Sequence, residues 1–182
     1  MAVEAGIREI TDAAENVQRE YGRQDDSLGG YLAVNAVYGG LVAGLFRLAR
    51  WRGRKLPKRV SAGDLALLAV ATHKLSRTLS KDAVTSPLRA PFTEFEGSSD
   101  SPGEINEKVR GTGWRKSLGE LLTCPFCMDQ WVATGFVAGL VAAPKATRLV
   151  ASVFAIRAGA DALHHTYAAA ERAAASVGAS AR

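Results

Sequence analysis

The apolar residues of this chain are gathered into long blocks, and this arrangement limits the folds open to it. The first block, GGYLAVNAVYGGLVAGLFRLA at 29–49, contains a single charged residue, Arg47, near its end. As a helix it would rise about 31 Å, which matches the hydrocarbon thickness of a bilayer, about 30 Å. The block therefore predicts a helix able to cross a membrane. Gly40 and Gly44 within it have the spacing at which two helices approach closely in lipid, so they are a candidate homo-oligomer contact.

Three further apolar blocks predict helices at 61–80, at 125–143 and from about 146 onwards. Lys74 and Arg77 interrupt the first of these three, and each would cost about 3 kcal/mol at the centre of a bilayer. We therefore expect that helix either to span with polar partners or to lie on the cytoplasmic surface.

The last apolar block is interrupted by Arg157 and Asp161. On a helix these residues are neighbours, so they can neutralise each other inside a bundle. The Ala-rich residues at 171–182 are expected to form a flexible tail.

Two polar regions, 1–28 and 81–123, dilute the apolar blocks, so that mean hydropathy is −0.01. Residues 2–22 predict an amphipathic helix because apolar residues recur every three or four positions. This stripe can pack on the same chain, lie on the bilayer surface or pair with a second copy through residues 3–21. The stripe consists of Val3, Ile7, Ile10, Ala14, Val17 and Tyr21.

Proline and glycine residues punctuate 86–113, which predicts a largely non-helical segment with short helices at 104–110 and 114–122. The fold class is therefore expected to be all-α, a membrane-embedded helical bundle with two to four apolar helices and an amphipathic N-terminal helix. The predicted organisation is an amphipathic helix at 1–28, a membrane helical domain at 29–170 with a polar middle segment at 81–123, and the tail at 171–182.

Seven basic residues and no acid follow the first apolar block, within residues 47–59. Such a cluster suits phosphate groups, and its place beside an apolar helix favours lipid head groups over nucleic acid. We expect the bilayer to be a partner, nucleic acid not to be one, and the cluster to lie on the cytoplasmic side. The cluster consists of Arg47, Arg50, Arg52, Arg54, Lys55, Lys58 and Arg59.

Residues 1–28 are polar and lack the pattern of a signal peptide.

Cys124 and Cys127 form a Cys-x-x-Cys pair at the start of the 125–143 helix. Free N–H groups at a helix start stabilise a thiolate, so a thiol-redox pair is one reading. A metal site is a second reading, although a structural zinc site needs four ligands, which two chains would have to supply together. The third reading is structural anchoring of the helix start by a small buried pair. No cofactor is predicted, and zinc at Cys124 and Cys127 is left open.

A second polar group surrounds the end of the 61–80 helix. Arg77 and Asp82 can pair across that end, and Arg89 can bind a phosphate or a carboxylate. Ordinary structural ion pairs explain the same residues. The sequence contains no Gly-rich phosphate loop, Ser-His-Asp order or His-Glu-x-x-His pattern, so an enzyme is the less favoured class.

Three short motifs resemble a known family: Arg77-x4-Asp82, the segment Leu88-Arg89-Ala90-Pro91-Phe92, and Leu122-Thr123-Cys124-Pro125-x-Cys127-x3-Trp131. Together they are similar to a family of small bacterial membrane proteins described only as a domain of unknown function, over about residues 60–145. The resemblance implies an integral membrane protein in bacteria and brings no established activity. With the apolar blocks, it leads us to expect a multi-pass protein of the bacterial cell membrane. The candidate functional residues are Arg77, Asp82, Arg89, Pro91, Phe92, Cys124, Cys127 and Trp131.

The sequence therefore favours a small integral membrane protein with a structural or interaction role. A thiol-redox or metal-binding membrane protein using the Cys-x-x-Cys pair is the first alternative. A soluble helical bundle is the second.

Overall fold

A computed structural model describes residues 12, 28–54, 56–57 and 59–180 of the chain. It divides into two compact units: unit 1 comprises Met1–Leu48 with Thr78–Met128, and unit 2 comprises Ala49–Arg77 with Asp129–Arg182. Apart from Asp12, the amphipathic helix expected at 2–22, with its pairing stripe at 3–21, lies outside the described residues.

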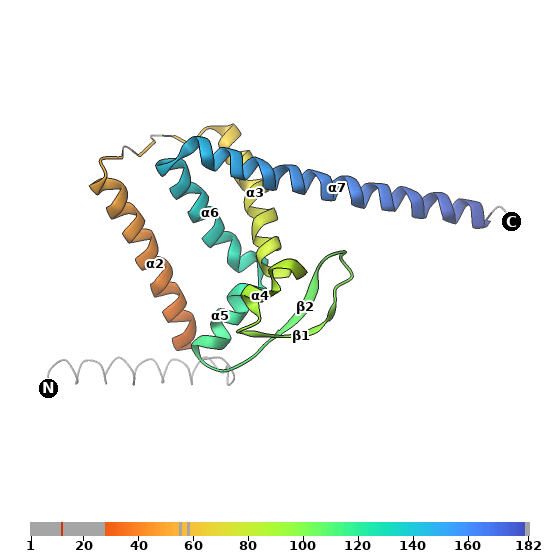
Figure 1. Ribbon diagram of the computed structural model, residues 1–182, viewed down its shortest axis with the longest axis horizontal. Coiled ribbons are helices and arrows are strands. Elements are labelled where there is room, and N and C mark those ends of the chain that lie inside the picture. Colours follow the sequence, from red (N-terminus) through yellow and green to blue (C-terminus); the bar gives the residue numbers. More distant parts are fainter. Residues whose placement is uncertain (1–11, 13–27, 55, 58, 181–182) are drawn as a thin grey trace. The chain divides into compact units, whose positions relative to one another are not determined.

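The four long helices expected from the apolar blocks are present (Figure 1). The α3 helix begins after Ser61, whose Oγ accepts a hydrogen bond from the Asp64 N–H at 3.0 Å, the usual arrangement of a serine N-cap. The last helix is longer than expected and includes most of the 171–182 tail, in keeping with the high helix propensity of its alanines. The helices are α2 (Leu28–Trp51), α3 (Ala62–Lys81), α6 (Pro125–Ala142) and α7 (Pro144–Ser180).

The C-terminal end of α2 is closed by a glycine turn. The Arg54 N–H donates to the Ala49 carbonyl at 2.9 Å, and the Gly53 N–H donates to the Arg50 carbonyl at 3.0 Å. This pair of bonds is the Schellman motif, which needs a left-handed residue after the helix. Gly53 supplies it with a φ of 63°. The sequence thus sets a sharp end to the apolar helix within its arginine cluster.

The expectation of an all-α fold is wrong in the middle segment. Residues 104–110, expected as a short helix, hold strand β2 (Ile105–Val109), which pairs antiparallel with β1 (Thr93–Ser98). Along β2 half-buried residues alternate with exposed ones, and this period of two is that of a strand. The register shifts between Phe95 and Gly97, which marks a bulge.

Short elements connect α3 to the hairpin and the hairpin to α6. The 3-10 turn η1 (Ala83–Thr85) and helix α4 (Ser86–Arg89) lie within the segment expected to be largely non-helical. Pro87 is in the first turn of α4, where its missing N–H is no loss. Helix α5 (Trp114–Thr123) confirms the short helix expected at 114–122.

Unit 2 contains a small buried apolar core and three polar pairs. Lys74, only 8% exposed, has its Nζ 2.5 Å from the Asp161 carboxylate. The sequence predicts that Arg157 neutralises Asp161; Lys74 is a further partner of that carboxylate, and both cations lower its pKa, Lys74 more strongly. The Ser76 hydroxyl donates to Asp129. At the surface Arg148 forms two hydrogen bonds with Asp64, at 2.7 and 2.9 Å. The apolar core residues are Leu68, Ala71, Val132, Phe136 and Ala151.

Candidate functional site

The largest fully buried side chain among the described residues is Arg89, at the end of α4 in unit 1. A buried guanidinium needs partners for its donors, because an unpaired buried charge is strongly destabilising. Its Nε donates to Glu107 of β2 in an ion pair. Its Nη1 donates to the Leu79 carbonyl at 2.6 Å and to the Thr85 hydroxyl at 2.8 Å, and its Nη2 donates to the Asp82 carbonyl at 3.1 Å.

Two of these acceptors belong to the C-terminal end of α3. The last carbonyls of a helix have no partner within the helix, and a cation there also offsets the negative end of the helix dipole. Arg89 therefore caps α3 with its guanidinium. Thr85 reinforces this end, since its hydroxyl lies 2.6 Å from the Thr78 carbonyl.

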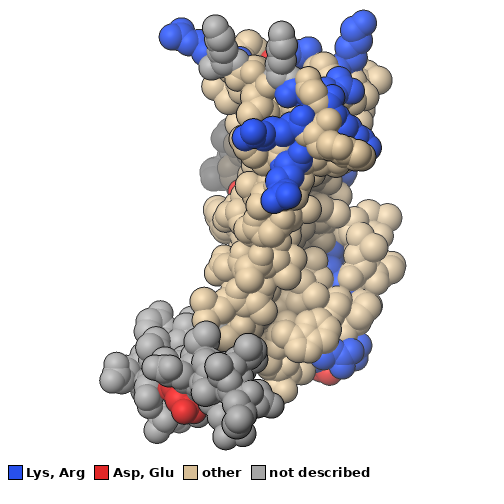
Figure 2. All heavy atoms as spheres, turned by 90° about the vertical axis from the view of Figure 1, so that its left-hand side faces the viewer, with Lys and Arg blue, Asp and Glu red and all other residues tan. Residues whose placement is uncertain are grey.

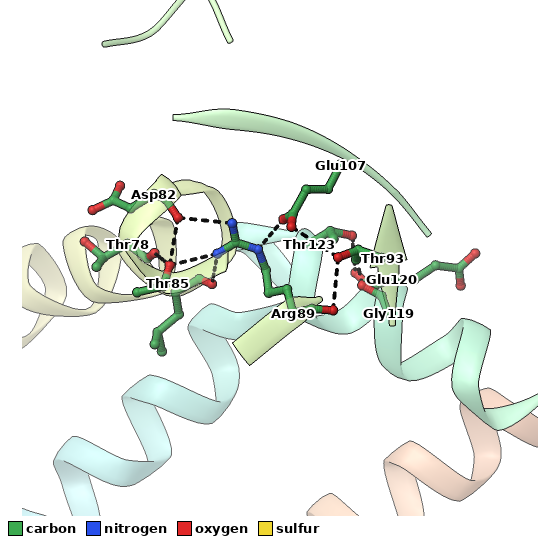
Figure 3. Close-up of polar contacts among 10 residues, drawn as sticks. Thr78, Asp82, Thr85, Arg89, Thr93, Glu107, Gly119, Glu120 and Thr123 are labelled. Atoms are coloured by element: carbon green, nitrogen blue, oxygen red, sulfur yellow. Dashed lines mark hydrogen bonds and ion pairs between the residues drawn. The ribbon is translucent and has the colours of Figure 1, made fainter. Parts of the chain in front are cut away.

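The hairpin closes the other side of the network (Figure 3). The Glu107 side chain is 6% exposed, and its Oε1 accepts a hydrogen bond from the Thr93 hydroxyl at 3.1 Å. That hydroxyl lies 3.0 Å from the Arg89 carbonyl. We call Arg89, Thr85, Thr93 and Glu107 the Arg89 clamp. The sequence predicts a phosphate or a carboxylate as the partner of Arg89, and the chain itself supplies a carboxylate, that of Glu107. The clamp joins the C-terminal end of α3, α4 and the hairpin.

Pro91 and Phe92 form the turn between α4 and β1. Pro91 is exposed and Phe92 is half-buried. The Phe92 N–H donates to the Arg89 carbonyl at 2.8 Å, and the Phe92 carbonyl accepts from the Arg110 N–H at 3.0 Å. Beside them, a Cβ added to Gly119 of α5 would lie 2.6 Å from Val109 Cγ1 and 3.0 Å from the Phe92 carbonyl oxygen. Only glycine lets α5 approach the hairpin this closely.

The remaining candidates outside the cysteine pair are spread over α3 and α6. Asp82 is buried just after α3, and its backbone carbonyl accepts a hydrogen bond from Arg89 of the clamp. Arg77 is half-buried in α3, and Trp131 is half-buried in α6. The pairing of Arg77 with Asp82 stays a prediction.

Cys124 and Cys127 lie at the junction of α5 and α6, and both are free thiols. Their sulfur atoms are 2.7 Å apart, and the Cys127 N–H donates to the Cys124 Sγ at 3.3 Å. Burial, followed by the contact with Cys124, raises the pKa of the Cys127 thiol to about 11. Among the described residues, no group of three or more His, Cys, Asp or Glu side chains could hold a metal ion. A zinc ion bound by Cys124 and Cys127 would need further ligands from outside the described residues, for example from a second chain.

Comparison with known proteins places these features in a family. The family model called protein of unknown function, DUF1360, matches residues 67–167. The chain belongs to DUF1360. It is also 33% identical over 94 residues to the sporulation protein YjcA of Bacillus subtilis (strain 168), covering 50% of this chain and 80% of that protein. No solved structure matches the chain. The expected relationship to a bacterial family of unknown function is thereby confirmed.

The DUF1360 region contains the whole Arg89 clamp, Gly119 and the cysteine pair. Sequence reasoning selected Arg89 but missed its partners Thr85, Thr93 and Glu107. The alternation Ile-Asn-Glu-Lys-Val at 105–109 is the signal that could have found Glu107, because it places the glutamate on the same strand face as Ile105 and Val109. Gly119 within a helix had no signal beyond being glycine.

Proposed function

We propose that this DUF1360 protein is an integral membrane protein whose helix α2 crosses the bilayer, and that its role is structural or interaction. The observation that carries the proposal is the exposure of α2. Gly29–Trp51 is long and apolar enough to cross a membrane, and none of its apolar stretch is buried by the described chain. The apolar core helix of a soluble protein would be mostly buried, since apolar surface is driven out of water.

The ends of α2 fit the two surfaces of a bilayer. Tyr31 and Trp51 lie near opposite ends of the helix, about 30 Å apart along its axis. Aromatic side chains with a polar atom favour the membrane–water interface. The Tyr31 hydroxyl donates to Glu120 of α5 at 2.5 Å, which links the start of α2 to the body that the Arg89 clamp holds. Trp51 is 83% exposed.

The distribution of buried residues supports the same environment. Within the described part of the chain, nine polar or charged side chains are buried, against five apolar ones. A water-soluble domain of this length would bury mainly apolar side chains. Large apolar residues are exposed on the later helices too, for example Val153 and Ile156 of α7. Polar groups inside and apolar groups outside are typical of helices that face lipid.

The proposal commits to one crossing. Among the residues that the structure describes, α2 is the single helix with the length and apolar character of a span. The multi-pass arrangement expected from the sequence stays a prediction. The rival hypothesis is a soluble helical bundle, which the carbonate extraction described below tests.

A structural role is favoured over an enzyme because the best polar cluster is internally satisfied. Every donor group of Arg89 has a partner within the protein, and the side chain is fully buried. A substrate group would have to displace Glu107 or a helix carbonyl to reach it. The clamp therefore serves to hold a rigid polar body next to the start of α2.

The experiment is alkaline carbonate extraction of membranes from cells that produce the full chain. We compare wild type with V37R/L41R, which places two arginines on exposed positions of α2, and with the matched control V84R/F95R, which alters two exposed apolar positions of unit 1. Two arginines in the hydrocarbon would cost about 6 kcal/mol on insertion scales. Wild type and control should stay in the pellet, while V37R/L41R should be extracted or degraded. Wild type that stays monodisperse in the supernatant without detergent would overturn the proposal.

The cysteine pair supports a second candidate function, thiol–disulfide exchange. Its support is the contact between two free sulfurs, one of them on an exposed residue. In the exchange, Cys124 and Cys127 would form a disulfide while a disulfide of a partner molecule is reduced to two thiols. Titration of the protein against glutathione disulfide, with Cys127→Ser as control, tests it. Two thiols that persist in excess glutathione disulfide would count against exchange.

A further inference from the structure

The end of α2 places a set of arginines on the surface beside an exposed apolar helix. The Schellman turn ends the helix at Trp51, so that Arg50 is in its last turn and Arg54 follows the turn at Gly53. All five described arginines of residues 47–59 are exposed, and Figure 2 shows Lys and Arg side chains gathered at one end of the face drawn there. We call residues 47–59 the basic segment; its described arginines are Arg47, Arg50, Arg52, Arg54 and Arg59.

The charge of the basic segment is not compensated locally in the sequence. No Asp or Glu occurs in 47–59. Two arginines elsewhere in the described chain do have acidic partners: Arg89 is paired with Glu107 and Arg148 with Asp64. Cations near a helix C-terminus offset the negative end of its dipole, but five guanidinium groups exceed that need. The surplus charge suits an external anion.

The neighbours of these arginines indicate which kind of anion. Trp51 lies between Arg50 and Arg52 and is 83% exposed, and Phe46 and Leu48 are exposed one turn earlier. A bilayer of anionic phospholipid offers phosphate groups to the guanidinium forks and acyl chains to the apolar residues. A nucleic acid offers the phosphates but leaves the apolar side of α2 without a partner.

We propose that the basic segment binds the head groups of anionic phospholipids at the membrane surface where α2 ends. This inference rests on the proposed function, because it assumes that α2 meets lipid. It names the class of lipid that is bound and the part of the protein that binds it. The protein prefers acidic over zwitterionic lipid, and this preference depends on the charges at 50–59 and not on the net charge of the whole protein.

Trp51 provides a reporter within the basic segment. In full-length W114F/W131F protein it is the single tryptophan, since the chain has three. We reconstitute this protein into bilayers that contain brominated phosphatidylglycerol or brominated phosphatidylcholine, and we measure the quenching of Trp51 fluorescence across lipid mixtures. We expect phosphatidylglycerol to be preferred by about fivefold or more, and the preference to weaken at high salt.

Two charge variants test the assignment to the basic segment. R50Q/R52Q/R54Q should reduce the preference for phosphatidylglycerol to below about twofold. The reason is that each basic residue near an acidic membrane surface strengthens binding to that surface by about several-fold. The matched control K108Q/R115Q/R172Q removes the same number of exposed charges elsewhere and should keep the preference. Native mass spectrometry of wild-type protein purified from equal lipid mixtures gives the same comparison without replacing any tryptophan.

The outcomes separate the inference from the proposed function. Equal quenching by both lipids would overturn the inference and leave the membrane anchor intact. No quenching by either lipid would overturn both. Equal lipid quenching together with tight, R50Q/R52Q/R54Q-sensitive binding of a DNA duplex at physiological salt would assign the basic segment to nucleic acid instead.

Discussion

Replacement of Arg89 by methionine is the perturbation that tests the clamp most severely. Methionine keeps an unbranched side chain of similar length and removes every donor. The change deletes the ion pair with Glu107 and the hydrogen bonds to Leu79, Thr85 and Asp82. The Glu107 carboxylate, 6% exposed, then keeps only the Thr93 hydroxyl as a partner.

The magnitude follows from the charge left behind. Removing one partner of a buried ion pair destabilises a protein by about 3–5 kcal/mol. For a chain of this size, each kcal/mol shifts the midpoint of thermal unfolding by about 2–4 °C, so we expect a loss of about 10 °C. Replacing both partners, as in R89M/E107L, removes the stranded carboxylate and should recover more than half of that loss.

The assay is thermal unfolding in one detergent, followed by far-UV circular dichroism for wild type, R89M, R89M/E107L and the control R172M. Arg172 is exposed on α7, so its replacement should change stability by about 0.5 kcal/mol or less. If R89M unfolded at the same temperature as R172M, the clamp would not hold the fold, and the structural role derived from it would be refuted.

Three further outcomes are expected. Gly119→Ala should lower the unfolding midpoint by several degrees, because its Cβ would meet Val109 Cγ1 at 2.6 Å, whereas Gly135→Ala, with nothing within 4 Å, should not; equal melting of the two would contradict the close approach of α5. The pKa of Asp64 is lowered from 3.8 to about 2, chiefly by its hydrogen bond with Arg148. The stability that this pair contributes is therefore present above pH 3.8 and lost as the pH falls through 2. In acid titrations, the difference in stability between wild type and Asp64→Asn should shrink over that pH range. Alkylation of Cys127, followed by mass spectrometry, should accelerate with pH up to about 11, and a plateau near pH 8.5 would show an ordinary thiol instead.

The helices were predictable from the sequence because their signals are local. Apolar blocks, Ser61 before α3 and Pro125 at the start of α6 all act within a few residues of the boundary that they mark. The hairpin was missed because its strands are short: β2 has five residues, and the proline and glycine residues around it indicate a loop.

The candidate site could be predicted only in part, because the contacts that form it are not local in the sequence. Arg89 was selected, but its partners come from α3, η1 and β2, and no spacing in the sequence indicates that Glu107 lies beside it. The same holds for Lys74, whose need for a polar partner could be foreseen while the identity of Asp161 as that partner could not. Long-range charge pairs depend on packing, which the sequence does not show position by position.

The most direct test of the membrane assignment is the chemical accessibility of α2. In a C124S/C127S background, single cysteines replace Leu41 in α2 and Phe95 in β1, both exposed in the structure, and intact membranes are treated with a polar maleimide. A bilayer around α2 predicts that the Leu41→Cys thiol is labelled only after detergent dissolves the membrane, while the Phe95→Cys thiol is labelled before and after. Equal labelling of the two thiols in intact membranes would contradict the assignment.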